Sequence, residues 1–357
     1  MTKKGTVIAV ISLLLVLVFV AVTLMGLNKK PETPPKNETT PPTRAETTVP
    51  PEPEEIVLSF IGDCIIGSES GIARNENFSW YADNVEHEYF FEKVRDELSQ
   101  DDLTFSNVEC VITDRDLDKI GKDYSPAFWF KTPTKNVDIL TLGSVEVAGI
   151  TNNHTSDYGA EGYEDTKKAL EEAGIPAGED CVPMYFDVKG LRIGVVYAHL
   201  WADYHLSYVE DALSDMEGQC DYKIVFFHGG EEGIHEPDDY KIKCARKLAE
   251  EGQCDLIVGS HPHVLQPMEV VNGVPIVYSL GNFCYSASIF PENKTVIFRV
   301  RLTRTEGRIN TETEIIPCYV YTGSENNYQP TIVTDKEDYD EIIGMMNTPV
   351  RYSYEQN

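Results

Sequence analysis

Basic residues are scarce in this sequence, which has 30 lysines and arginines against 59 aspartates and glutamates. The formal net charge of −29 repels the phosphates of nucleic acids, so we exclude a nucleic-acid partner. None of the eight cysteines forms a Cys-x-x-Cys pair, so a structural zinc site is not expected either. The sequence also has no internal repeat, which leaves an ordinary globular core as the expectation.

Charge is absent from the N-terminal stretch between Thr6 and Leu27, which lysines flank on both sides. About 20 apolar residues are enough to span a bilayer as a helix. The alternative is a cleaved signal peptide, but the stretch has no clear Ala-x-Ala-like site and no cysteine for a lipid anchor. We therefore predict that residues 1–30 are an uncleaved membrane anchor and that the rest of the chain lies outside the cell membrane.

Large apolar residues are almost missing from residues 31–55, which are rich in proline, threonine and glutamate. A segment of this composition cannot form a core and stays extended. We predict a linker that holds a folded domain off the membrane, through a cell-wall layer. That domain is expected at residues 56–322, and residues 323–357 are interpreted as an acidic C-terminal tail.

Short apolar runs alternate with helical patterns from residue 56 onward. The runs predict strands at Ile56–Ile61, Leu103–Asn107, Val145–Ile150, Leu191–Tyr197, Lys223–Phe227, Asp255–Gly259 and Val274–Ser279. Apolar spacing predicts helices at Phe78–Ser99, Val137–Leu142, Glu161–Ala173 and Tyr240–Glu251. Alternating residues at 295–303 and 311–322 predict an antiparallel hairpin with its turn at Glu306-Gly307. This order indicates a mixed α/β sandwich.

Polar residues follow five of the predicted strands: Asp63, Glu109, Asn153 with His154, His228, and His261 with His263. Each has an ordinary alternative, because Asp63 or Asn153 could cap a turn and a lone histidine is often structural. However, the C-terminal ends of parallel strands lie on one edge of a sheet, so these residues should crowd one cleft. Carboxylates buried together repel one another unless cations neutralise them. Oxygen and imidazole ligands without thiolate suit Mn, Fe or Zn.

The number of candidate ligands favours two divalent ions that share a bridging carboxylate. The candidates are Asp63, Glu109, Asn153, His228, His261 and His263. Two-metal sites generate hydroxide from water and hold an in-line displacement at phosphorus. His154 would then be free to hold an oxyanion or protonate a leaving group. Asp157 could orient His154, or it could be the N-cap of the following helix.

Six motifs in order along the chain resemble one family. They are GDCIIG at 62–67, FSNVE at 105–109, TNNHTSDYG at 151–159, HGGEE at 228–232, GSHPHVLQP at 259–267 and YSLGNF at 278–283. Together they are similar to the CapA family of capsule-synthesis proteins, which is associated with poly-γ-glutamate and resembles the calcineurin-like metallophosphatases. The resemblance implies a four-layer α/β/β/α sandwich, the six metal ligands above and a catalytic or phosphate-facing His154. Glu232 matches a family acid of unassigned role, and Asn282 lies in the last motif.

Two positions depart from the pattern of these relatives. The wider superfamily has Asp-x-His in its first metal motif, whereas this chain has Asp63-Cys64-Ile65. We therefore expect one metal to be held by fewer ligands. Similar proteins have His-Trp-Gly where this chain has His228-Gly229-Gly230, which should remove a bulky wall beside the site.

Cysteines near the proposed site lead to two further expectations. Cys220 and Cys254 precede His228 and His261 by eight and seven residues. If their strands are adjacent and parallel, the strand starts lie about 4.8 Å apart, and we predict a Cys220–Cys254 disulfide. The residues directly after two proposed ligands, Cys64 and Cys110, are expected to be buried thiols under the metal site.

The leading hypothesis is a membrane-anchored CapA-like protein with a di-metal phosphoesterase-type site, acting on an anionic polymer of the cell envelope within a capsule-synthesis complex. One alternative is a phosphomonoesterase or phosphodiesterase that acts on envelope phosphates. Another is a non-catalytic scaffold of a polymer export complex. Loss of phosphatase turnover in His154→Ala would favour an enzyme, whereas retained capsule in that variant would favour a scaffold.

Overall fold

The computed structural model describes residues 55–69, 77–123, 125–286 and 292–352. The predicted anchor and all of the predicted linker except Glu55 lie outside these residues. Among the helices of the described ranges, none combines the length and the apolar character needed to cross a membrane.

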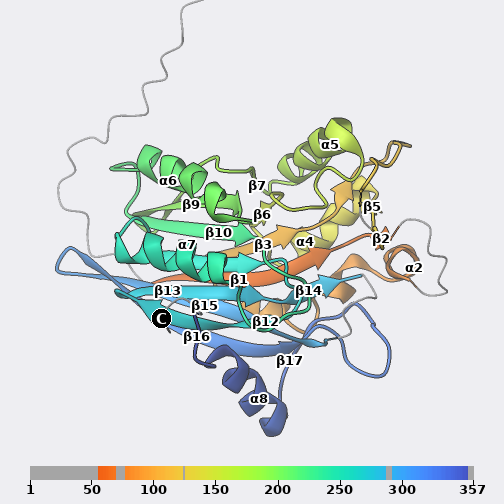
Figure 1. The fold of residues 1–357 in the computed structure, drawn as a ribbon. Coiled ribbons are helices and arrows are strands. Elements are labelled where there is room, and N and C mark those ends of the chain that lie inside the picture. Colours follow the sequence, from red (N-terminus) through yellow and green to blue (C-terminus); the bar gives the residue numbers. More distant parts are fainter. Residues whose placement is uncertain (1–54, 70–76, 124, 287–291, 353–357) are drawn as a thin grey trace, which may run out of the picture. The chain divides into compact units, whose positions relative to one another are not determined.

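Two β-sheets form the centre of the fold (Figure 1). The first has the order β17 (Thr331–Ile332), β16 (Arg308–Tyr319), β15 (Lys294–Thr305), β1 (Ile56–Ile65), β3 (Leu103–Val108), β6 (Val147–Gly149) and β7 (Ala177–Gly178), with β14 (Asn282–Tyr285) also paired to β1. The second has the order β12 (Leu265–Val271), β13 (Val274–Leu280), β11 (Leu256–Ser260), β10 (Tyr222–His228), β9 (Leu191–His199) and β8 (Met184–Val188). A small sheet joins β2 (Ser68–Glu69), β5 (Phe130–Thr132) and β4 (Val111–Ile112).

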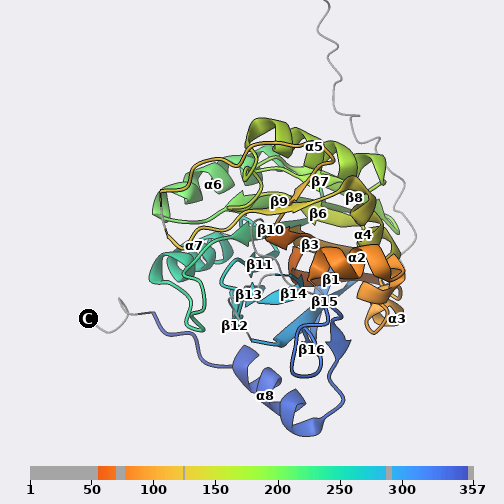
Figure 2. The ribbon, with the colours of Figure 1, turned by 90° about the vertical axis from the view of Figure 1, so that its right-hand side faces the viewer.

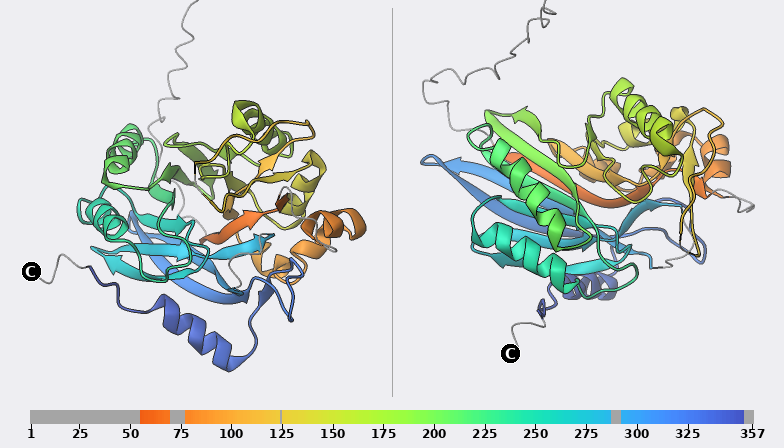
Figure 3. Two further views of the ribbon diagram at one scale, coloured as in Figure 1. Left: turned by 45° about the vertical axis from the view of Figure 1, so that its right-hand side comes forward. Right: turned by 45° about the horizontal axis from the view of Figure 1, so that its top comes forward.

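Helices pack on the outer faces of both large sheets (Figures 2 and 3). The outer face of the first sheet is covered by α2 (Phe78–Asn84), η1 (His87–Phe90), α3 (Arg95–Leu98), η2 (Thr134–Val137), α4 (Asp138–Leu142) and α5 (Gly159–Glu172). The outer face of the second is covered by α6 (Leu206–Asp215), which follows η3 (Asp203–His205), and by α7 (Asp239–Glu250). The predicted mixed α/β class is therefore confirmed.

The inner faces of the two sheets share one hydrophobic core. Phe60 of β1 stacks on Phe105 of β3 with ring centroids 4.9 Å apart, and it meets Phe226 of β10 edge to face at 6.2 Å. Such aromatic pairs contribute about 0.5–1.5 kcal/mol beyond the burial of their area. Helix α8 (Lys336–Met346), in the segment interpreted as an acidic tail, adds Ile342 and Met346 to this core.

The predicted strands are all present, but the first runs beyond its predicted end. Strand β1 continues past Gly62, with a shift of register between Phe60 and Asp63. A Cβ atom at Gly62 would lie 2.0 Å from the carbonyl oxygen of Gly281, so only glycine fits this close approach of two backbones. The irregularity lets Asp63 N donate to Gly281 O at 2.9 Å and pairs Asp63 with Asn282.

Two other expectations for secondary structure have different outcomes. The single helix predicted at 78–99 is wrong, because the chain there is divided into α2, η1 and α3. Its apolar side chains are nevertheless buried together, with Phe78 and Phe90 stacked at 4.7 Å. The terminal hairpin is confirmed as β15 and β16, and its turn residues Glu306 and Gly307 have φ angles of 51° and 77°.

The predicted Cys220–Cys254 disulfide is wrong, because all eight cysteines are free. Strands β10 and β11 are adjacent and parallel as expected, but their register pairs Ile224 with Leu256. Cys254, two residues before Leu256, therefore faces the level of Tyr222 and not Cys220. Cys64 and Cys110 are buried thiols, as expected, and burial raises the pKa of each to about 12.

Candidate metal centre

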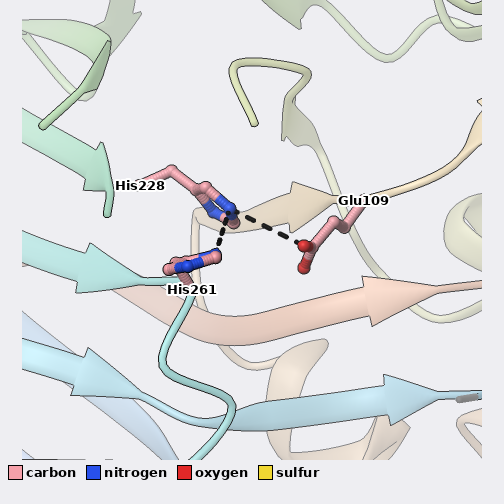
Figure 4. Close-up of side chains that lie close together, drawn as sticks. All are labelled: Glu109, His228 and His261. Atoms are coloured by element: carbon pink, nitrogen blue, oxygen red, sulfur yellow. Dashed lines mark hydrogen bonds and ion pairs between the residues drawn. The ribbon is translucent and has the colours of Figure 1, made fainter. Parts of the chain in front are cut away.

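Three strands from the two sheets bring Glu109, His228 and His261 together (Figure 4). Glu109 directly follows β3, His228 is the last residue of β10, and His261 directly follows β11. The His228 Nε2 atom lies 3.6 Å from Glu109 Oε1 and 3.0 Å from His261 Nδ1. The ligand atoms of this buried group all lie within 4.8 Å of one another.

A second buried group contains Asp63, His263 and again Glu109, with the same spacing limit of 4.8 Å. His263 Nδ1 lies 3.3 Å from Asp63 Oδ2, and His263 Nε2 lies 3.9 Å from Glu109 Oε1. Glu109 is thus the residue common to both buried groups.

The chemistry of Glu109 tests whether a metal fits here. Its side chain is fully buried, and neither carboxylate oxygen has a hydrogen-bond partner among the described residues. Burial raises the pKa of Glu109 well above its usual value; His263 opposes this shift, and the Asp63 carboxylate adds to it. A buried carboxylate without a donor is costly, and a cation between Glu109 and the imidazoles removes that cost. The residues present therefore fit divalent metal ions.

The protonation of the imidazoles is also compatible with metal binding. Burial lowers the pKa of His228 and of His261 well below the usual value, and the neighbouring histidines add to the effect. Both rings are therefore neutral at pH 7, as metal ligation requires. Burial also lowers the pKa of His263, but Glu109 and Asp63 outweigh burial and raise it to about 9. A metal ion at His263 would have to displace that proton.

The loop that carries His261 and His263 has an unusual backbone. His261 has a φ angle of 98° and His263 one of 60°, a region that costs a residue other than glycine about 1–3 kcal/mol. The backbone N–H of His261 donates to Asp63 Oδ2 at 3.2 Å. Strained residues of this kind persist where the surroundings fix them, and they cluster at functional sites.

His154 lies beside a buried ion pair. Its Nδ1 is 2.8 Å from Asp157 Oδ2, and Asp157 Oδ1 is 2.5 Å from the Lys122 ammonium. Asp157 Oδ2 also accepts from Phe130 N at 2.9 Å. Asp157 therefore orients His154, and the helix-cap alternative is wrong because Tyr158 occupies the N-cap of α5. Burial lowers the pKa of His154, while its hydrogen bond to Asp157 opposes that shift.

Asn153 and Asn282, the two predicted amides, both contact imidazoles of the groups above. Asn153 Oδ1 lies 2.8 Å from His228 Nε2, next to the Glu109–His228–His261 group. Asn282 Oδ1 lies 2.9 Å from His263 Nδ1, where it can set the orientation of that ring.

Two further asparagines were missed by the sequence reasoning. Asn107 Nδ2 donates to Asp63 Oδ1 at 2.7 Å and lies 3.2 Å from His228 Nδ1. Asn152 Nδ2 donates to Asn107 Oδ1 at 3.0 Å, and its own Oδ1 accepts from His154 N at 3.0 Å. Asn107 and Asn152 both lie in motifs already noted. The signal available in the sequence was an asparagine close to a candidate ligand, Glu109 in one motif and Asn153 in the other.

An aromatic wall was also missed, and the expectation that the wall is absent is wrong. Trp201, just after β9, meets the His261 ring edge to face at 4.6 Å and the His228 ring at 5.6 Å. A Cβ atom at Gly229 would lie 1.9 Å from Leu200 O, so the backbone that positions Trp201 excludes a side chain at 229. The wall therefore comes from a different strand.

Comparisons with known proteins identify relatives of this chain. Residues 57–287 match the family model described as bacterial capsule synthesis protein PGA_cap. The capsule biosynthesis protein CapA of Bacillus anthracis is 28% identical over 268 residues, which cover 66% of this chain and 61% of that protein. The PGA biosynthesis protein CapA of Bacillus subtilis (strain 168) is 28% identical over 251 residues, covering 64% of this chain and 62% of that protein.

The chain thus spans less than two thirds of the length of these curated relatives. A solved structure of a hypothetical protein from Thermus thermophilus is 14% identical, with a TM-score of 0.46, and the match covers 73% of this chain and 99% of that one. The family match covers more than half of the chain and contains every predicted metal ligand. The chain therefore belongs to the PGA_cap family of bacterial capsule synthesis proteins, whose domain is metallophosphatase-like.

Proposed function

We propose that this chain is a CapA-like protein of the cell envelope whose two-ion centre hydrolyses a phosphate ester during synthesis, release or anchoring of an anionic surface polymer. The single observation that carries the proposal is Glu109, a fully buried carboxylate that has no hydrogen-bond partner in the described part of the chain and belongs to two adjacent ligand groups. The names of the curated relatives support the capsule context.

In this proposal one ion is held by Asp63, Glu109 and His263, and the other by Glu109, Asn153, His228 and His261. The ions, of Mn, Fe or Zn, would supply Lewis acidity and a metal-activated hydroxide at neutral pH. Asn107 and Asn282 would hold the ligands Asp63 and His263 in orientation, in the way that residues around metal ligands usually do.

His154 is proposed as the residue that acts on the leaving group or a phosphate oxygen. Its Nδ1 is bonded to Asp157, which leaves Nε2 as the atom available to a substrate. The buried Lys122 balances the charge of Asp157, so Asp157 can fix the ring without having to take up the proton itself.

The predicted anchor at residues 1–30 and the linker at 31–55 support a location on the outer side of the cell membrane. The partners in this proposal are the membrane, a phosphate ester or one end of an anionic envelope polymer, and a capsule-synthesis complex.

The test uses the purified full-length chain loaded with Mn²⁺ and supplied with aryl phosphate monoesters and diesters. We expect about two bound ions per chain and turnover that falls by at least about 10²-fold in His154→Ala while the metal content stays unchanged. Hydrolysis that is absent from the metal-loaded protein, or unaffected by His154→Ala, would contradict the proposal.

A non-catalytic scaffold is the second candidate, and the burial of the site favours it. The four imidazoles His154, His228, His261 and His263 are each 5% exposed or less, which restricts access for a bulky substrate. A scaffold would bind the same ions without turning over any ester. Capsule retained in a His154→Ala strain, with loss of capsule when residues 1–30 are deleted, would support this alternative.

A further inference from the structure

Glu232 lies on the loop between β10 and α7, and its side chain is 43% exposed. An exposed glutamate normally points into water, yet Glu232 Oε1 is 3.9 Å from His261 Nε2. Glu232, His261 and His263 form a third group whose ligand atoms all lie within 4.8 Å of one another. This group takes one histidine from each of the two buried groups, so Glu232 neighbours ligands of both proposed ions.

The loop that carries Glu232 is tied to the strand end that carries the two histidines. Gly233 N donates to Pro262 O at 2.8 Å, directly between His261 and His263 in sequence. Before Glu232, the backbone N–H of Glu231 donates to Asp238 Oδ2 at 3.1 Å. Positive φ angles of 121° at Gly230 and 74° at Gly233 allow the tight path on either side. These hydrogen bonds therefore fix the backbone around Glu232, although its carboxylate is exposed to solvent.

A buried lysine also contributes to fixing this loop. Gln266 Nε2 donates to Ile234 O at 2.7 Å, and Gln266 Oε1 accepts from Lys241 Nζ at 2.7 Å. Lys241 and Gln266 are both fully buried. A buried amine needs a hydrogen-bond partner, so the contacts of Lys241 with Gln266 and of Gln266 with Ile234 hold this part of the loop in place.

The second ligand group, Asp63–Glu109–His263, lacks the histidine that the wider superfamily has at position 65. Position 65 is an isoleucine that is fully buried, and its side chain has no atom able to bind a metal. This leaves the Asp63–Glu109–His263 group with three protein ligands. Carboxylate oxygen is a suitable ligand for the same ions as imidazole.

We propose that Glu232 is a carboxylate ligand of the two-ion centre, supplied from the solvent side by the loop at 229–237 beside His261 and His263. This inference rests on the proposed metal centre. It assigns Glu232 a metal-binding role on the solvent-exposed side of the centre.

The adjacent Glu231 provides a matched control, because it has the same charge on the same loop and belongs to none of the three ligand groups. Full-length wild type, Glu232→Gln and Glu231→Gln are stripped with chelator and titrated with Mn²⁺ by calorimetry and metal analysis. We expect Glu232→Gln to lose at least about 10-fold in affinity for one of the two ions. Glu231→Gln should bind both ions as the wild type does.

Electron paramagnetic resonance of bound Mn²⁺ gives an independent readout. At an ion concentration that saturates the wild type, the signal of a spin-coupled Mn²⁺ pair should be weaker in Glu232→Gln. Unchanged affinity and an unchanged coupled signal in Glu232→Gln would overturn the inference while leaving the metal centre intact. A wild-type chain that binds no Mn²⁺ would overturn the proposed function as well, so the two failures are distinguishable. Thermal melting of both variants with chelator present checks that each is folded.

Discussion

Replacing Glu109 with glutamine should change stability in opposite directions with and without metal. In the chelator-treated protein, the Glu109 carboxyl group is buried with no donor to either oxygen from the described residues. Burial and the nearby Asp63 disfavour its charge, and His263 offsets only part of this effect. An unsatisfied buried polar group costs about 1–3 kcal/mol, and a charged one costs more. Glu109→Gln removes the charge at nearly constant volume, so we expect the metal-free variant to be more stable than the metal-free wild type by about that amount.

For a domain of this size, about 1 kcal/mol corresponds to a change of about 2 °C in Tm. The expected gain for Glu109→Gln with chelator is therefore about 2–6 °C by scanning calorimetry. With saturating Mn²⁺ the order should reverse, because the wild type gains binding energy that the amide cannot provide at a bridging position. The change of sign between the two conditions is the diagnostic result.

The direction of the pH dependence follows from the raised pKa of Glu109. A carboxyl group whose pKa is higher in the folded than in the unfolded state favours folding when it is protonated. Its contribution is present below the unfolded value of about 4.3 and is lost as the pH rises through the folded value. The advantage of metal-free Glu109→Gln over the wild type should therefore grow as the pH rises from acid to neutral.

Glu146 is a suitable control, because burial raises its pKa as well but its Oε2 accepts from Thr104 N at 2.7 Å. Glu146→Gln should not gain stability in chelator, and metal should not change its rank. If Glu109→Gln lowers the Tm equally in chelator and in Mn²⁺, the claim that Glu109 is a buried carboxyl group without a hydrogen-bond donor at a metal site is refuted.

Three further predictions concern other parts of the site. Because the pKa of His263 is raised to about 9, its proton stabilises the metal-free fold below about pH 6.5 and is lost through pH 9. Mn²⁺ binding at pH 7.5 should therefore release about one proton, which calorimetry in buffers of different ionisation enthalpy measures. Asp157→Asn should lower kcat by about 10²-fold with metal content unchanged, since His154 loses the acceptor that orients it. Trp201 should dominate quenching of tryptophan fluorescence by Mn²⁺, because its ring lies 4.6 Å from that of His261.

Each of these has a control within the chain. His263→Gln should abolish the proton release, and release that persists in this variant would assign the proton elsewhere. Asp157→Asn leaves the buried Lys122 without its acid, so the Asp157→Asn/Lys122→Met double variant separates lost orientation from lost stability. Quenching should largely disappear in Trp201→Phe and remain in Trp80→Phe, and the reverse pattern would place Trp201 away from the ions.

The strand ends of the site could be predicted from sequence because they depend on local patterns. Apolar runs followed by polar residues identified Glu109, His228 and His261. We expected them on one sheet edge, whereas the structure brings together strand ends of two sheets, β3 in the first and β10 and β11 in the second. The same rule applies to any chain with this order of elements, and it needs no knowledge of register.

Features that depend on exact register or on distant backbone could not be predicted. The predicted disulfide was wrong because the register of β10 and β11 differs by two residues from the alignment that we assumed. The extension of β1 depends on Gly281, more than 200 positions later in the chain, and the wall at Trp201 depends on the path of Leu200 beside Gly229. Asn107 and Asn152 were overlooked because an amide that supports a ligand has no motif of its own.

The charge of the whole chain and the charge of the site have opposite consequences for a polyanion. Two divalent ions would bring four positive charges against the three carboxylates of Asp63, Glu109 and Glu232, while Asp157 is balanced by Lys122. A local positive charge would then sit in a molecule of net charge −29, and at about 0.1 M salt each surface charge acts over only about 10 Å. One terminal anionic group is therefore attracted at the centre, whereas the remainder of a polymer is repelled by the surrounding surface. Under the proposed function, this balance favours action on chain ends over binding along the length of a polymer.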